Sequence, residues 1–240
     1  MPLDFGPIRV MTFDCFGTLI DWETGILGAL RPIVAKRRVE VSDEELLSRF
    51  AQAEVALERG SFRRYRSVLE LATVEIAQSL GFTPSARERE ALARALPGWP
   101  LFADTSESLA RLAERFELGI ISNVDDDLFA PVRKRLGAPI RHLMTAERAR
   151  TYKPSRNNFL RALAEIGRPW GEVLHVAQSL YHDVATARSL GLATVWIDRR
   201  GGAPGGATPP SSARPDLRAP SLRTLADLAL GPLPEAPRSP

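Results

Sequence analysis

The chain begins with a short apolar run and then changes to a helical spacing. Residues 8–14 are apolar and rich in β-branched side chains, which predicts a buried strand that ends at Asp14. From residue 22 to residue 96, apolar side chains recur three or four positions apart, as on one face of a helix. Ser42 and Glu45 have the spacing of a capping box at the start of one such helix. We therefore predict a helical segment directly after the first strand.

Short apolar strands alternate with helical segments after residue 97. The pattern predicts strands at 118–123, 142–144, 173–177 and 193–197, and helices at 104–115, 128–136, 155–166 and 183–190. Such alternation is typical of βαβ units, whose strands pair in parallel. The predicted fold class is therefore α/β, with a Rossmann-like parallel-sheet core and an inserted helical cap domain.

The end of the chain has a different composition. Gly, Pro and Ala dominate residues 200–215, which predicts a loop, and 222–230 is predicted to form a last short helix. The Pro-rich residues after it are expected to fray. We accordingly divide the chain into a catalytic core at 1–20 and 97–240, with a loop-rich tail from about 200 to 240, and a cap at 21–96.

Composition narrows the classes of function. Of the 240 residues, 44% are hydrophobic and 25% charged, which is enough apolar chain to bury a core. The net charge is only +3, so nothing in it indicates binding to nucleic acid. The single cysteine, Cys15, excludes an internal disulfide. No apolar run approaches the ~18 residues of a membrane span, and the first residues do not resemble a signal peptide. We expect a cytoplasmic protein without membrane or nucleic-acid partners.

Polar side chains gather where the predicted strands end. In a parallel α/β sheet, ligands bind beyond the carboxyl ends of the strands. The residues at or after these ends are Asp14 and Thr18, then Ser122 and Asn123, then Lys153, and finally Gln178 and Asp183. Two carboxylates, a lysine and several hydroxyl and amide groups therefore converge on one edge. This arrangement is expected for a nucleophilic aspartate with supporting groups.

The same residues resemble the motifs of the haloacid dehalogenase superfamily. The segment 13–21, with Asp14, is similar to the first motif, and Ser122-Asn123 to the second. Lys153 is similar to the third motif, and 176–183 to a modified fourth. The helical segment falls where this superfamily carries its cap. The resemblance covers residues 8–198 and implies a hydrolase with Asp14 as its nucleophile.

One position indicates the subclass. Phosphatases of this superfamily carry a second Asp two residues after the nucleophile, as general acid, where this chain has Phe16. Gln178 likewise stands near an acidic magnesium ligand of those enzymes. Since Mg²⁺ is commonly anchored by carboxylates, these losses argue against phosphoryl transfer. The (S)-2-haloacid dehalogenases also have an aromatic residue at the position of Phe16 and use no metal or cofactor.

The resemblance to the dehalogenases implies a mechanism. Asp14 attacks Cα of a small 2-substituted carboxylate and displaces its leaving group, and water then hydrolyses the ester to a 2-hydroxy acid. Lys153 is expected to keep Asp14 ionised. Thr18 is expected to bond the nucleophile or the substrate, and Asp183 to orient Lys153 or activate the water.

Other residues are expected to bind the substrate. Ser122 and Asn123 are assigned to its carboxylate, and Phe16 and Gln178 to the walls of its pocket. The dehalogenases use a cap arginine near the leaving group. The candidates for it, which surround Tyr65, are Arg63, Arg64 and Arg66, with Tyr65 and Arg66 taken as substrate-binding residues.

Two departures keep other functions open. Phe159 replaces a tyrosine of the dehalogenases, and Gln178 and Leu180 replace a serine and an asparagine. The segment 178–183, together with Trp22, is similar to a sister branch of the superfamily that includes an azetidine-2-carboxylate hydrolase. A magnesium-dependent phosphatase and a non-catalytic binding protein remain further alternatives, and the resemblance is compatible with a homodimer. His182 is interpreted as a structural or solvent-facing residue.

Overall fold

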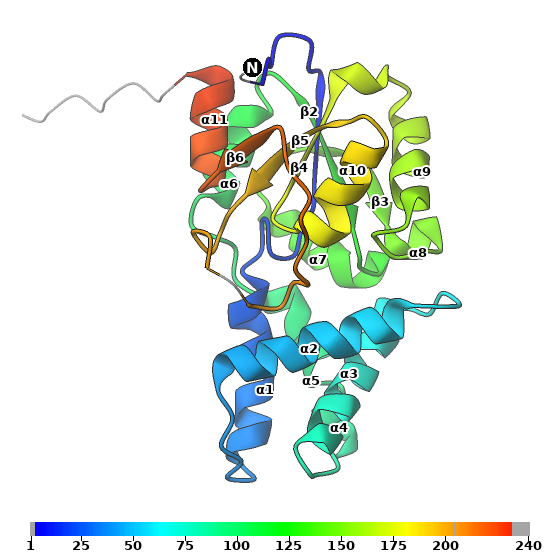
Figure 1. The fold of residues 1–240 in the computed structure, drawn as a ribbon, viewed down its shortest axis with the longest axis vertical. Helices are drawn as coiled ribbons and strands as arrows, with labels where there is room; N and C mark the ends of the chain where they lie inside the picture. Colours follow the sequence, from blue (N-terminus) through cyan, green and yellow to red (C-terminus); the bar gives the residue numbers. More distant parts are fainter. Residues whose placement is uncertain (1–2, 204, 232–240) are drawn as a thin grey trace, which may run out of the picture.

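Six parallel strands form the centre of the molecule (Figure 1). The computed structural model describes residues 3–203 and 205–231. The strands are β1 Val10–Phe13, β2 Glu117–Ser122, β3 Ile140–Thr145, β4 Val173–Ala177, β5 Ala193–Ile197 and β6 Leu217–Ala219. Their order across the sheet is β3-β2-β1-β4-β5-β6, and each neighbouring pair is parallel. The predicted α/β class with a Rossmann-like parallel sheet is confirmed.

Helices cover both faces of the sheet. They are α6 Thr105–Leu112, α7 Asp126–Arg135, α8 Ala146–Ala149, α9 Arg156–Ile166, α10 Ala185–Ser189 and α11 Leu222–Leu230, with a 3-10 helix at Trp170–Glu172 and a π-helical turn at Leu180–Val184. Met11 and Phe13 of β1 pack in the core that includes α6, α7 and α11. Val10 packs in the opposite core with α9 and α10. Because side chains alternate along a strand, β1 supplies both cores.

A helical insert lies between β1 and β2, below the sheet in Figure 1. It consists of α1 Trp22–Ala35, α2 Asp43–Glu58, α3 Tyr65–Ser79, α4 Ala86–Arg89, α5 Ala91–Ala95 and a 3-10 helix at Leu96–Gly98. Residues 22–98 are all described and contain no strand. The predicted helical segment is therefore present, and its division from the core as a separate cap domain stays a prediction.

The predicted caps form in part. Asp21 accepts a hydrogen bond from the Thr24 backbone at the start of α1. Ser42 Oγ accepts from the Glu45 backbone N–H at 3.2 Å, but the Glu45 carboxylate binds Arg49 instead of returning to Ser42. The expected reciprocal box is therefore only half present at this helix. A complete capping box occurs at the start of α4.

The tail holds more structure than the sequence predicted. Strand β6 pairs with β5 between the predicted loop at 200–215 and α11, in a part of the tail where no strand was predicted, and α11 lies where a helix was predicted. Three residues are too few for a hydrophobic period, so only pairing with β5 reveals this strand. The predicted fraying concerns residues outside the described ones. In the described part of the chain, no helix is both long and apolar enough to cross a bilayer.

Candidate active site

Asp14 lies at the carboxyl end of β1, in the centre of the sheet. Its backbone N–H donates to the Val176 carbonyl, the residue is 6% exposed, and its side chain lines a cavity together with residues of the helical insert. Thr18 Oγ1 donates to Asp14 Oδ2 at 2.6 Å, and Lys153 Nζ donates to Oδ1 at 2.8 Å. Gly17, at φ +95°, allows the turn that brings Thr18 back over the strand end. Both carboxylate oxygens are thus fixed by charged or hydroxyl donors.

Lys153 joins the two carboxylates of the site. Its Nζ donates to Asp14 Oδ1 at 2.8 Å, to Asp183 Oδ1 at 2.6 Å and to the Ile121 carbonyl at 2.9 Å. These three bonds use all three ammonium hydrogens. Although burial lowers the pKa of Lys153, the adjacent Asp14 and Asp183 outweigh it and raise that pKa above its usual value. The lysine is therefore a fixed positive charge.

The two aspartates respond differently to this lysine. Burial raises the pKa of Asp14, and although Lys153 works in the predicted direction, burial has the larger effect. Burial also acts on Asp183, but Lys153 and His175 together hold its pKa below the usual value. Asp183 sits in the π-helical turn, and its Oδ2 is buried without a hydrogen-bond partner. Asp183 thus contacts Lys153 directly, and its role in orienting that lysine or activating water stays a prediction.

Most of the predicted site residues line one small cavity. Thr18 and Arg66 are the exceptions: Thr18 is fully buried behind Asp14, and Arg66 lies elsewhere. Ser122 Oγ is buried without a partner, so its hydroxyl is free for a ligand. The cavity has a volume of about 30 Å³, which is room for one or two water molecules.

Asn123 and Gln178 have most of their polar groups engaged. Asn123 accepts from the Lys153 backbone N–H at 2.7 Å, and its amide donates to the Lys153 carbonyl and to the Glu58 carboxylate. Both amide hydrogens are thereby used, so Asn123 positions Lys153 and has none left for a substrate carboxylate. Gln178 Oε1 accepts from the Thr208 hydroxyl at 3.0 Å.

The predicted cap arginines do not enter the cavity. The guanidinium of Arg66 binds Asp127 at 3.1 Å, and that of Arg64 binds Asp127 at 2.7 Å. Asp125 accepts from the backbone N–H groups of Tyr65 and Arg66 and so caps helix α3 from the core side. This cap turns Tyr65 inward and Arg66 outward, a choice that sequence spacing alone does not reveal.

Tyr65 contacts Glu54, a residue that the sequence analysis did not predict to be in the site. Its hydroxyl donates to Glu54 Oε1 at 2.5 Å, and both side chains line the cavity. Glu54 lies on the buried stripe of α2 that includes Leu47, Phe50 and Ala51. The sequence does contain a signal for this residue, because Glu54 is a glutamate at helical spacing among the apolar residues of one helix face. Burial raises the pKa of Glu54 to about 7.

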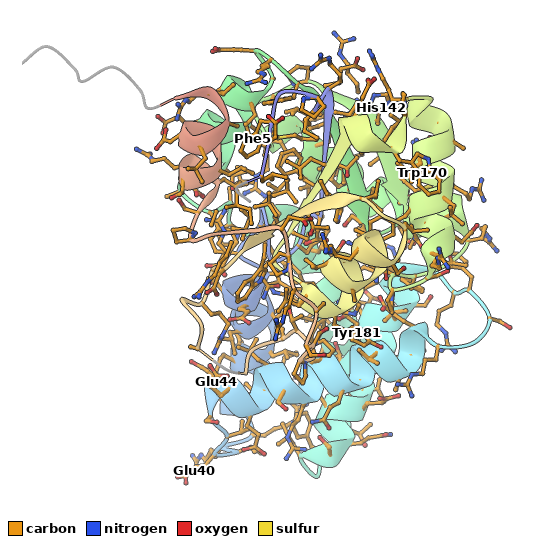
Figure 2. All side chains as sticks on the ribbon, turned by 45° about the horizontal axis from the view of Figure 1, so that its top comes forward. Phe5, Glu40, Glu44, His142, Trp170 and Tyr181 are labelled. Atoms are coloured by element: carbon orange, nitrogen blue, oxygen red, sulfur yellow. The ribbon has the colours of Figure 1, made fainter. Side chains whose placement is uncertain are left out.

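His182 also belongs to the site. It is 7% exposed, bonds Ser179 Oγ through Nδ1 and lines the cavity, so it does not face the solvent, and its interpretation as a structural residue stays a prediction. Burial lowers the pKa of His182 to about 4, so the ring is neutral at physiological pH. Its neighbour Tyr181 lies against α2 (Figure 2). Residues of α2 and of the π-helical turn line a second small cavity there.

A larger cavity adjoins the small one. It has a volume of about 860 Å³ and lies between α2 and the segment around residues 205–211. Gln178 and Thr208 line both cavities, so their hydrogen bond stands between them.

The polar side chains of this site do not form a magnesium site. In the described residues, no group of three or more His, Cys, Asp or Glu side chains is placed to hold a metal. The Lys153 ammonium fills the space between Asp14 and Asp183, and Phe16 and Gln178 supply no carboxylate. Because Mg²⁺ is usually held by carboxylate oxygens in an octahedral shell, these residues do not fit it.

Comparisons with known proteins identify the family of this chain. The model of the haloacid dehalogenase-like hydrolase family matches residues 8–191. Haloacid dehalogenase-like hydrolase domain-containing protein 3 of Danio rerio is 32% identical over 106 residues, which are 43% of this chain and 44% of that protein. The match therefore spans less than half the length of this relative.

Solved structures share the fold. The defluorinating L-2-haloacid dehalogenase Rha0230 is 24% identical, with a TM-score of 0.75, over 95% of this chain and 99% of that one. The L-2-haloacid dehalogenase of Xanthobacter autotrophicus is 20% identical, with a TM-score of 0.78, over 93% and 99%. A putative hydrolase of Bacillus subtilis bound to magnesium is 18% identical, with a TM-score of 0.76, over 92% and 98%. Since the family match runs from before β1 to beyond α10, this chain belongs to the haloacid dehalogenase-like hydrolases.

Proposed function

We propose that this hydrolase displaces a leaving group from Cα of a small 2-substituted carboxylate without a metal ion. The observation that carries the proposal is the buried Asp14 carboxylate, held by Lys153 and Thr18 in a cavity walled by Phe16. A nucleophile needs a fixed geometry, and the hydrogen bonds from Lys153 and Thr18 supply it to Asp14. Phe16 offers no proton, which suits a leaving group that departs without a general acid at that position.

The roles of the side chains follow from their contacts. An Asp14 oxygen forms a bond to Cα while the bond to the leaving group breaks, and the product of this step is an ester. Water then adds to the Asp14 carbonyl carbon, and the 2-hydroxy acid leaves. Asp183, whose Oδ2 has no partner, takes the proton from this water, and Lys153 stabilises the negative charge on Asp14. The free hydroxyl of Ser122 binds the substrate carboxylate.

Substrate access requires movement in this proposal. A cavity of about 30 Å³ cannot hold a carboxylate of several heavy atoms, so the lining has to move outward. The larger cavity beside it supplies a route, and breaking the hydrogen bond between Thr208 and Gln178 joins the two spaces. Closure afterwards excludes water from the displacement step.

A 2-haloacid is the first candidate substrate, as in the dehalogenases that share the fold. A strained cyclic amino acid such as azetidine-2-carboxylate is the second, and one observation favours it. Glu54 lines the cavity, and none of the candidate arginines does. A departing halide is stabilised by cationic or apolar surroundings, whereas a departing ring nitrogen is compatible with a carboxylate.

The test uses both substrates with the whole chain and EDTA. We expect release of chloride from (S)-2-chloropropionate, or opening of L-azetidine-2-carboxylate, and at least a 1,000-fold loss, on the order of 4 kcal/mol, in Asp14→Asn. Magnesium-dependent release of phosphate from small phosphoesters, with neither substrate turned over, would contradict the proposal. Binding of either substrate without turnover in the wild type would favour the non-catalytic alternative.

A further inference from the structure

One carboxyl group from the helical insert meets three aromatic rings at this cavity. Glu54 of α2, Trp22 of α1 and Tyr65 of α3 line it from the helical insert, and Phe16 lines it from the turn after β1. Trp22 is held edge-on against Phe50 with 5.9 Å between ring centres, and Phe16 packs edge-on against Trp99. The rings are therefore fixed by packing. Aromatic faces and a carboxylate are the groups that proteins use to bind alkylammonium ions.

Carboxyl groups outnumber basic side chains around this cavity. Asp14, Asp183 and Glu54 line it, while Lys153 is the one Lys or Arg side chain among the described lining residues. All three hydrogens of that lysine are already used. A purely anionic substrate would add a further negative charge to this set. A substrate with a positive group would offset it.

Glu54 has one hydrogen bond but no cation. Tyr65 holds Oε1, and within the described residues no Lys, Arg or His nitrogen lies within ion-pair distance of the Glu54 carboxyl. Its side chain is only 3% exposed, and burial raises its pKa to about 7. Burial without a cationic partner disfavours the ionised form of a carboxyl group. A cation bound beside it would hold the carboxylate charged at neutral pH.

We propose that Glu54, with Trp22, Phe16 and Tyr65, forms an ammonium-binding subsite, so that the substrates of this enzyme are zwitterionic amino acids whose amine lies beside Asp14. This inference rests on the proposed displacement reaction and assigns the class of its substrate. Glu54 determines specificity by binding the ammonium, and the aromatic rings exclude water around it. A 2-haloacid has no ammonium group, so it leaves the Glu54 carboxyl without a cation beside it.

The binding test uses two unreactive rings of the same size. L-Proline carries the carboxylate and the ammonium, and cyclopentanecarboxylate carries the carboxylate alone. Calorimetric titration of the wild-type protein at pH 7.5 is expected to give at least roughly tenfold tighter binding of L-proline. Equal binding of the two rings, tighter binding of cyclopentanecarboxylate, or binding of neither overturns the inference.

Variants at Glu54 connect this preference to the carboxylate. Glu54→Gln keeps the shape and removes the charge, and the preference for L-proline is expected to fall at least tenfold. Glu54→Asp keeps the charge as a matched control and is expected to retain most of the preference. A preference that survives in a folded Glu54→Gln variant overturns the assignment. If that variant does not fold, the wild-type comparison of the two rings decides alone.

The two proposals fail in different ways. Turnover that depends on Asp14, together with equal binding of the two rings, removes the ammonium subsite and leaves the displacement reaction. A preference for L-proline that depends on Glu54, without turnover of any 2-substituted carboxylate, removes the displacement reaction instead.

Discussion

At the scale of single residues, the site stabilises two titratable groups in their neutral forms. Burial raises the pKa of Glu54 to about 7 and lowers the pKa of His182 to about 4. Both lie in the same cavity as the charged group of Lys153. In an unfolded chain their pKa values return to about 4.5 and 6.5. Folding stability therefore depends on pH through both residues, with opposite signs.

The two residues affect stability in opposite directions as the pH changes. Between pH 4.5 and 7 the folded protein keeps a proton on Glu54 that the unfolded chain has lost, so this residue lowers stability as the pH rises. Between pH 6.5 and 4 the unfolded chain binds a proton at His182 that the folded protein does not, so this residue lowers stability as the pH falls. Each effect is on the order of 3 kcal/mol across its window.

Urea unfolding from pH 4 to 7.5 tests these signs. Relative to the wild type, Glu54→Gln is expected to gain stability as the pH rises, and His182→Gln as the pH falls. Each variant serves as the control for the other. Differences from the wild type with the same sign in both variants would show that burial does not set these pKa values.

At the scale of elements, helix α1 is positioned by a close contact with the segment before β2. A Cβ built on Gly25 would lie 2.3 Å from Trp99 Cγ, so the absence of a side chain allows this ring to rest on the helix. Trp99 in turn packs against Phe16, which walls the cavity. The glycine thus connects the packing of the insert to the shape of the site.

Gly25→Ala is therefore expected to lower the free energy of unfolding by about 1–3 kcal/mol, because Trp99 has to move. Gly28 of the same helix is exposed and has no atom within 4 Å of a built Cβ. Gly28→Ala is the matched control, and it is expected to gain up to about 1 kcal/mol from helix propensity. Urea unfolding measures both, and equal effects would contradict the role of the Trp99 contact.

At the scale of the whole molecule, a buried carboxylate connects the insert to the core. Asp125, fully buried at the start of α7, accepts from the backbone N–H groups of Tyr65 and Arg66 at 2.8 and 2.9 Å. These are two of the donors that the start of a helix leaves without an internal partner. Asp125 thereby fixes where α3 meets the sheet and where Tyr65 enters the cavity.

Asp125→Ala is expected to lower the free energy of unfolding by about 1–3 kcal/mol, because two buried donors lose their acceptor. Faster hydrogen exchange of the Tyr65 and Arg66 amides would place the loss at this contact. Asp127→Ala removes half-exposed ion pairs to Arg64 and Arg66, so as a control it should change stability by less than about 1 kcal/mol. Unchanged amide exchange in Asp125→Ala would contradict the role given to this contact.

The sequence predicted the positions of the strands more accurately than the contacts within the site. Hydrophobic runs located β1 to β5 because buried strands have a strong local pattern, whereas β6 is three residues long and depends on its pairing with β5. Asp14, Lys153 and Asp183 were expected together from the edge at which parallel strands end, and they meet through one ammonium. The direction of Arg66 was not predictable, since it depends on Asp125 from another part of the chain.

The sequence by itself determined the alternation of strands and helices, the place of the helical insert, and the meeting of Asp14 with Lys153 at one edge of the sheet. These are local patterns, or follow from the one edge that parallel strands share. Only the tertiary structure decided that Glu54, rather than an arginine, lies in the cavity with Asp14. The physical reason is that the rotation and height of α2 and α3 over the sheet are set by packing and by long-range caps such as Asp125. No single stretch of sequence encodes these contacts.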